Sequence, residues 1–108
     1  MSASKTSITA ENLNQLIGTP DCPTIIDVRR KKAFDDSDQI IAAAEWIDHE
    51  KAADQASKLT GAAIVYCVHG HEVSQNAATA LRYEGIDAVF LEGGIEGFIE
   101  AGFETDKK

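Results

Sequence analysis

Three apolar runs along the chain have the character of β-strands. Residues 62–66 (AAIVY) are apolar without a break, which is typical of a strand covered on both faces in a parallel sheet. Residues 24–28 (TIIDV) and 86–91 (IDAVFL) are shorter or less uniform runs bounded by turn residues. The sequence therefore predicts a strand at each of these three places.

Helical spacing of apolar residues follows or precedes each strand. Residues 10–17 form a predicted helix that Thr9 can cap, and residues 73–83 and 95–101 form two more. A glycine follows each of these three segments and favours helix termination there. Strands that alternate with helices predict an α/β domain with a mostly parallel sheet.

The remaining segments have weaker patterns. Residues 46–59 have a faint helical periodicity, with apolar residues that include Trp46, Ala53 and Ala56. Residues 29–34 are expected to form one turn of helix or a loop, and residues 35–38 (DDSD) a polar break.

Cys67 directly follows the run at 62–66, and the chain then turns at Gly70 into the helix predicted from residue 73. In parallel sheets, ligands bind beyond the carboxyl ends of the strands. Unpaired N–H groups at the start of a helix carry partial positive charge, and such donors favour a thiolate over a thiol. We interpret Cys67 as a candidate nucleophile; the alternative is a buried cysteine that acts as a small apolar side chain.

Size and charge limit the function classes. The 108 residues, 44% of them hydrophobic, suit one compact domain over residues 1–108. A net charge of −8 disfavours nucleic acid and anionic membrane surfaces as partners. Residues 1–7 lack the apolar segment of a signal peptide, and no apolar run reaches the roughly 20 residues of a membrane span. We expect a cytoplasmic protein whose two cysteines, Cys22 and Cys67, stay reduced.

Three segments in this order resemble the single-domain rhodanese family over about residues 8–103. They are residues 25–29 (IIDVR), residues 64–67 (IVYC) with Gly70 and Ser74 after them, and residues 91–95 (LEGGI). The resemblance implies a rhodanese-like three-layer domain, with a central, mostly parallel sheet of about five strands flanked by helices. It also implies a thiosulfate sulfurtransferase-like enzyme without a cofactor. In its cycle, Cys67 takes sulfane sulfur from thiosulfate, a persulfide or a polysulfide and passes it, as a persulfide, to a thiol, cyanide or protein acceptor.

The expected catalytic residue is Cys67, and the expected substrate-binding residues come from the loop after it or from the end of the first long strand. They are Val68, His69, Gly70, His71, Glu72, Val73 and Arg29. The imidazoles can donate hydrogen bonds to a thiolate or an oxyanion, or can simply be solvated. Arg29 faces the mouth of the site or pairs with a carboxylate. A metal site on Cys67, His69 and His71 is disfavoured, because the spacing is too tight for a usual structural zinc site.

Two segments depart from the family pattern. Residues 39–43 (QIIAA) stand where the family usually reads His-Ile-Pro-Gly-Ala, and this predicts an altered connecting loop. Glu72 stands where many relatives carry Arg or Thr. A carboxylate there repels an anionic donor, which counts against thiosulfate itself. Alternatively, the Glu72 carboxylate pairs with His71 or is solvated.

Three other functions compete with the sulfurtransferase. A related phosphatase and arsenate-reductase type has Arg six residues after its cysteine, but this chain has Val73 there and lacks that cation for a dianion. A non-catalytic binding or regulatory module would more often lose the cysteine. A sulfur carrier dedicated to one partner protein would turn over small molecules poorly.

Overall fold

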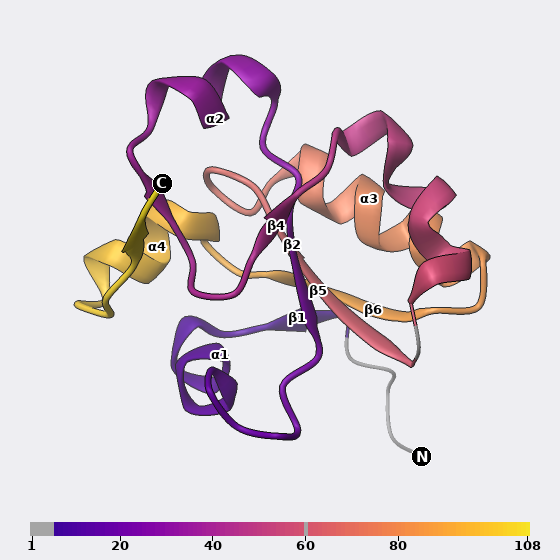
Figure 1. Ribbon diagram of the computed structural model, residues 1–108, viewed down its shortest axis with the longest axis horizontal. Coiled ribbons are helices and arrows are strands. Elements are labelled where there is room, and N and C mark those ends of the chain that lie inside the picture. The colour runs from indigo at the N-terminus through magenta and orange to yellow at the C-terminus, as the bar shows by residue number, and fades with distance from the viewer. Residues whose placement is uncertain (1–5, 60) are drawn as a thin grey trace.

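The protein is described by a computed structural model that covers residues 6–59 and 61–108. Its centre is a sheet of five parallel strands, which confirms the predicted α/β class (Figure 1). The strand order is β1 (Ser7–Ile8), β6 (Asp87–Leu91), β5 (Ala62–Tyr66), β2 (Thr24–Asp27) and β4 (Glu45–Trp46). Asp27 at the end of β2 pairs in register with Tyr66 at the end of β5. Both strands therefore end at the same edge of the sheet.

Helices cover both faces of the sheet. In Figure 1, α1 (Ala10–Leu16) and α4 (Gly94–Glu100) lie on one side, and α3 (Glu72–Tyr83) lies on the other with the 3-10 helix η1 (His49–Lys58). Successive residues of β5 point to opposite faces, so Ile64 packs in the core under α1 and α4, while Val65 packs in the core under α3. Burial on both faces explains why this strand is apolar throughout.

A small outer layer crosses the carboxyl edge of the sheet. The helix α2 (Lys31–Asp36) has no buried residue and is followed by β3 (Gln39–Ile40), which pairs antiparallel with β7 (Asp106–Lys107). After β7, the Lys108 ammonium donates hydrogen bonds to the carbonyls of Phe34 and Ser37 at the end of α2. The C-terminal residues thus hold α2 in place over the sheet edge.

The segment at residues 46–59 differs most from the prediction. Trp46 lies in the edge strand β4 rather than in a helix, and Ala52 rather than Ala53 is the fully buried residue of η1. A 3-10 helix has three residues per turn, so a search for the 3.6-residue period selects the wrong face.

Two further differences concern short elements. Asp35 and Asp36, expected in a polar break, complete α2 and pair with Lys31 and Lys32 one turn earlier. The two-residue strands β1, β3, β4 and β7 were not predicted, because two residues are too few to show an alternating pattern.

Residues 1–5, on which the signal-peptide prediction largely rests, lie outside the described residues. Among the helices of residues 6–59 and 61–108, none combines the length and the apolar character that crossing a bilayer requires.

Candidate active site

Cys67 lies at the carboxyl end of β5, as expected. Residues 68–71 then lead into α3, and in Figure 1 this loop runs beneath α2. The Cys67 side chain is only 6% exposed. The parallel arrangement places the end of β2, with Asp27, beside it. The sheet edge, rather than the loop alone, therefore fixes where the sulfur lies.

The start of α4 holds the first two peptides of the loop. The backbone N–H groups of Ile95 and Glu96 donate to the carbonyls of Cys67 and Val68, each at 3.0 Å. In a trans peptide the C=O and the N–H point in opposite directions. The N–H groups that follow these two carbonyls therefore point away from α4.

Two glycines make this approach possible. A Cβ at Gly94 would lie 2.4 Å from the carbonyl oxygens of both Cys67 and Val68. A Cβ at Gly70 would lie 2.7 Å from the Leu91 carbonyl oxygen. Both glycines also have positive φ, 61° and 72°, which other L-residues rarely adopt. Two segments that the sequence comparison treated separately, at residues 64–74 and 91–95, thus form one packed unit.

Most backbone carbonyls of the loop that begins at Cys67 accept hydrogen bonds, whereas its amides have no acceptor among the described residues. Besides the two carbonyls held by α4, those of Gly70 and His71 accept hydrogen bonds from the Gln75 side chain (3.0 Å) and backbone N–H (3.1 Å). By contrast, none of the backbone N–H groups of residues 68–74 donates to an acceptor within residues 6–59 and 61–108. These amides therefore have no acceptor among the described residues, and unpaired N–H groups at the start of a helix are suited to an anion.

Ser74 contacts the sulfur directly. Its hydroxyl oxygen lies 3.1 Å from Sγ of Cys67, within hydrogen-bonding distance, and its side chain is fully buried. The sequence comparison used Ser74 only to mark the start of the helix. Its position in the first turn of that helix, facing back towards the preceding strand, is the signal that could have identified it.

A pocket of about 270 Å³ opens beside Cys67. Six of the seven predicted substrate-binding residues line it: Arg29, Val68, His69, His71, Glu72 and Val73. Gly70 does not, because its backbone is buried against the turn after β6. Arg30 and Ala33, from the start of α2, complete the lining. The sequence did not place them at the pocket: Arg30 belongs to a basic run that was expected to be solvated, and only the fold brings α2 over the pocket.

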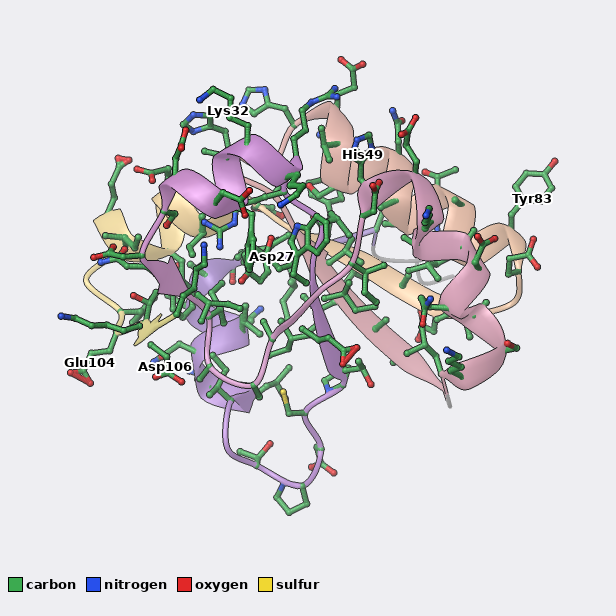
Figure 2. All side chains as sticks on the ribbon, turned by 45° about the horizontal axis from the view of Figure 1, so that its top comes forward. Asp27, Lys32, His49, Tyr83, Glu104 and Asp106 are labelled. Carbon is green, nitrogen blue, oxygen red and sulfur yellow. The ribbon has the colours of Figure 1, made fainter. Side chains whose placement is uncertain are left out.

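Asp27 and Arg29 form a buried ion pair under the pocket. Nη2 and Nε of Arg29 lie 2.6 and 3.0 Å from Oδ2 of Asp27, and the Tyr66 hydroxyl donates to the same oxygen at 2.9 Å. Figure 2 shows Asp27 near the middle of the molecule. Burial, together with the charge of Asp27, raises the pKa of the Tyr66 hydroxyl far above its ordinary value of 10.0. Asp27 therefore has a structural role: it holds Arg29 and the Tyr66 hydroxyl in place.

Arg29 has one nitrogen left for the pocket. Nη2 also donates to the Gln39 carbonyl at 2.9 Å, while Nη1 has no hydrogen-bond partner among the described residues. Within those residues no fully buried side-chain nitrogen or oxygen lacks a partner. Nη1 therefore retains some accessible surface, and Arg29 is one of the residues that line the pocket.

The ligand atoms of the two loop histidines and of Cys67 do not converge on one point among the described residues. The rings of His69 and His71 lie 6.1 Å apart, and within the described parts of the chain their nitrogens and Sγ of Cys67 do not all converge within 4.8 Å. Asp48, His49 and Glu50 do converge, but on η1, and Asp48 there caps the helix through the Glu50 N–H.

The family model described as "Rhodanese-like domain" matches residues 9–101 of the chain. No curated protein matches closely enough to count as a relative.

Solved structures give the same result. A rhodanese-related protein from Thermoplasma volcanium is 28% identical with a TM-score of 0.77, over 93% of this chain and 96% of its own. A rhodanese homologue from Thermus thermophilus is 31% identical with a TM-score of 0.64, over 82% and 94%. A Rhodopseudomonas palustris protein titled a possible tyrosine phosphatase has a TM-score of 0.81 over 95% and 86%, but at 19% identity it shows the fold alone.

Proposed function

The chain belongs to the rhodanese-like family, and from this membership we propose that it is a sulfurtransferase that carries sulfane sulfur as a persulfide on Cys67. The observation that supports this most is that the N–H groups of residues 68–74, in the loop and helix start after Cys67, have no acceptor among the described residues. Such donors stabilise the negative charge of a thiolate and of a persulfide anion. The pocket gives a donor access to a sulfur that is otherwise buried.

The reaction has two half-reactions. In the first, the Cys67 thiolate attacks the outer sulfur of a donor such as a persulfide or thiosulfate. A new S–S bond forms on Sγ while the donor's S–S bond breaks, and the leaving group takes the electron pair. In the second, a thiolate, cyanide or a protein acceptor attacks the outer sulfur, and Cys67 leaves as a thiolate. His69 and His71 are exposed at the rim and can donate hydrogen bonds to the leaving group.

A phosphatase or arsenate-reductase-like reaction is the second candidate. We consider it because the Rhodopseudomonas palustris protein named a possible tyrosine phosphatase has the same fold. That chemistry needs a fixed cation for the dianion, and Val73 stands at the position that would supply it. Arg29 cannot replace it fully, because two of its nitrogens are committed to Asp27. A non-catalytic module is disfavoured because such a module would more often lose the cysteine, and this chain has Cys67 in the lining of the pocket.

Intact-mass measurement tests the proposal. After treatment with polysulfide or thiosulfate, the wild-type protein should gain one sulfur that a reducing agent removes. Cys67→Ser should abolish the gain, whereas Cys22→Ser, at the matched second thiol, should retain it. Hydrolysis of an aryl phosphate without sulfur uptake would establish the phosphatase instead. Cys67 that takes no sulfur and alkylates no faster than free cysteine would indicate a binding module.

A further inference from the structure

The pocket beside Cys67 carries two opposite charges that have no partner among the described residues. Arg30, at the start of α2, and Glu72, the first residue of α3, are both exposed and both line the pocket. Within residues 6–59 and 61–108 the ion pairs join Arg29 with Asp27, Lys31 with Asp35 and Lys32 with Asp36. Neither Arg30 nor Glu72 takes part in an ion pair or a side-chain hydrogen bond there. Their charges are thus free to meet those of a ligand.

The cationic side of the pocket extends below Arg30. The buried Arg29 lines the same pocket, and its Nη1 has no hydrogen-bond partner among the described residues, whereas the rest of its guanidinium is bonded to Asp27 and Gln39. Arg29 is only 2% exposed. A donor held this firmly and left unpaired is suited to a carboxylate oxygen. The pocket therefore offers a carboxylate one exposed and one pre-positioned guanidinium.

The size of the pocket suggests more than a small inorganic anion. Its volume of about 270 Å³ is room for several water molecules. Apolar side chains of Ala33, Val68 and Val73 line it between the charged groups. A purely anionic donor would leave this apolar surface unused and would meet the Glu72 carboxylate, whereas an amino-acid-sized molecule would contact both.

We propose that the thiol that exchanges sulfur with Cys67 is a zwitterionic amino-acid thiol of the cysteine type. This inference rests on the proposed function. The ligand carboxylate pairs with Arg30 and Nη1 of Arg29, its ammonium pairs with Glu72, and its sulfur faces Cys67. Glu72, which is unfavourable for thiosulfate, thereby becomes a specificity-determining residue.

The transfer step balances without a co-reactant. The ligand thiol loses its proton, and its thiolate attacks the outer sulfur of the Cys67 persulfide. The new S–S bond forms on the ligand as the bond to Sγ breaks, and Sγ takes the electron pair and then a proton. The products are a ligand persulfide and the free Cys67 thiol, and the reverse step loads Cys67 from the same persulfide.

Three acceptor thiols distinguish the contribution of the ligand carboxylate from that of the ligand ammonium. Wild-type protein is loaded with sulfur from polysulfide and freed of excess reagent. Loss of the added sulfur is then timed by intact mass with L-cysteine, with cysteamine, which lacks the carboxylate, and with 3-mercaptopropionate, which lacks the ammonium. Each variant is compared with wild type for the same thiol, so differences in thiol reactivity cancel.

Each variant should affect a different pair of thiols. Glu72→Gln should slow transfer to L-cysteine and cysteamine about two- to five-fold, the range of a partly exposed ion pair, and should not slow transfer to 3-mercaptopropionate, from which it removes a like charge. Arg30→Gln should slow transfer to L-cysteine and 3-mercaptopropionate and should not slow transfer to cysteamine, for the same reason with the charges reversed. Glu84→Gln and Lys58→Gln make the same changes in net charge at exposed residues outside the pocket lining, and should alter no rate.

The outcomes separate this inference from the proposed function. Sulfur that loads on Cys67 and leaves for all three thiols with the same response to both variants would overturn the zwitterionic ligand and keep the sulfurtransferase. Failure to load any sulfur on Cys67 would overturn both.

Discussion

At the scale of single residues, Ser74 offers a measurable contribution to the chemistry of Cys67. Its hydroxyl lies 3.1 Å from the sulfur. We predict that Ser74→Ala slows both alkylation of Cys67 by iodoacetamide and sulfur transfer about two- to ten-fold, because the thiolate loses a hydrogen-bond donor.

Thr79→Ala is the matched control for Ser74. It removes a hydroxyl from the same helix, but one that donates to the Gln75 carbonyl. Both rates should stay at the wild-type value in this variant. Equal slowing by the two substitutions would show that the effect comes from the helix rather than from the contact with sulfur.

Ala43 tests a different residue-scale feature, the strain of the loop before β4. Its φ is 66°, in the left-handed region, and the Ala44 N–H closes the turn on the Ile41 carbonyl. The motif comparison aligned the family glycine with Ala42, so the glycine-favouring conformation falls one residue later. We predict that Ala43→Gly raises the free energy of unfolding by about 0.5 kcal/mol. Relief of about 1–2 kcal/mol of strain exceeds the extra entropy cost of glycine, about 0.5–1 kcal/mol.

Chemical denaturation measures this change, with Ala101→Gly as the control. Ala101 is also exposed but has φ −73°, which costs an L-residue nothing. Glycine there should lower the free energy of unfolding. A decrease in both variants would contradict the interpretation of Ala43 as strained.

At the scale of elements, the contact between α4 and the cysteine loop is the junction on which the site depends. We predict that Gly94→Ala costs about 3 kcal/mol of stability, because a Cβ 2.4 Å from two carbonyl oxygens forces the loop or the helix to move. Urea denaturation measures the loss, and the rate of sulfur uptake should fall with it.

Gly102→Ala controls for the backbone conformation alone. Gly102 also has a positive φ, 89°, but a Cβ there would meet nothing within 4 Å. Its cost should be about 1 kcal/mol or less, since only the left-handed conformation is penalised. Equal costs at the two glycines would mean that close packing at Gly94 contributes nothing.

Elements with a long periodic pattern were predictable, and short ones were not. β5 and α3 match their predicted ranges within a residue. Burial of β5 on both faces makes it apolar throughout, and burial of one face of α3 places its apolar residues at helical spacing, so both patterns can be recognised in the sequence. Trp46 belongs to a two-residue strand whose pairing with β2 is set by a distant segment. No local pattern records such a partner.

At the scale of the whole molecule, the buried Asp27–Arg29–Tyr66 network makes stability depend on pH. The pKa of Tyr66 is raised in the folded protein, so above pH 10 the unfolded chain releases this proton while the folded chain keeps it. The stabilisation is complete below about pH 10 and is lost as the pH rises. We predict that this residue lowers the free energy of unfolding by up to about 1.4 kcal/mol per pH unit there.

Between pH 9 and 11.5, Tyr66→Phe should remove this residue's contribution to the decrease of the free energy of unfolding with pH. At neutral pH it should cost about 1–3 kcal/mol, since Asp27 and the Ile41 N–H each lose a partner. Tyr83→Phe is the control because Tyr83 is 89% exposed, and Figure 2 shows it extending from the surface. An unchanged slope in Tyr66→Phe would contradict the assignment.

The sequence by itself determined the α/β class, the strand that ends at Cys67, the glycine turns and most of the loop that lines the pocket. These follow from local causes, namely the period of burial and the backbone freedom of glycine. The tertiary structure alone decided that α4 holds the carbonyls of the loop, that Ser74 lies beside the sulfur, and that Arg30 faces the same pocket as Glu72. Such contacts join residues that are remote along the chain or depend on the direction of a side chain, and a linear pattern records neither.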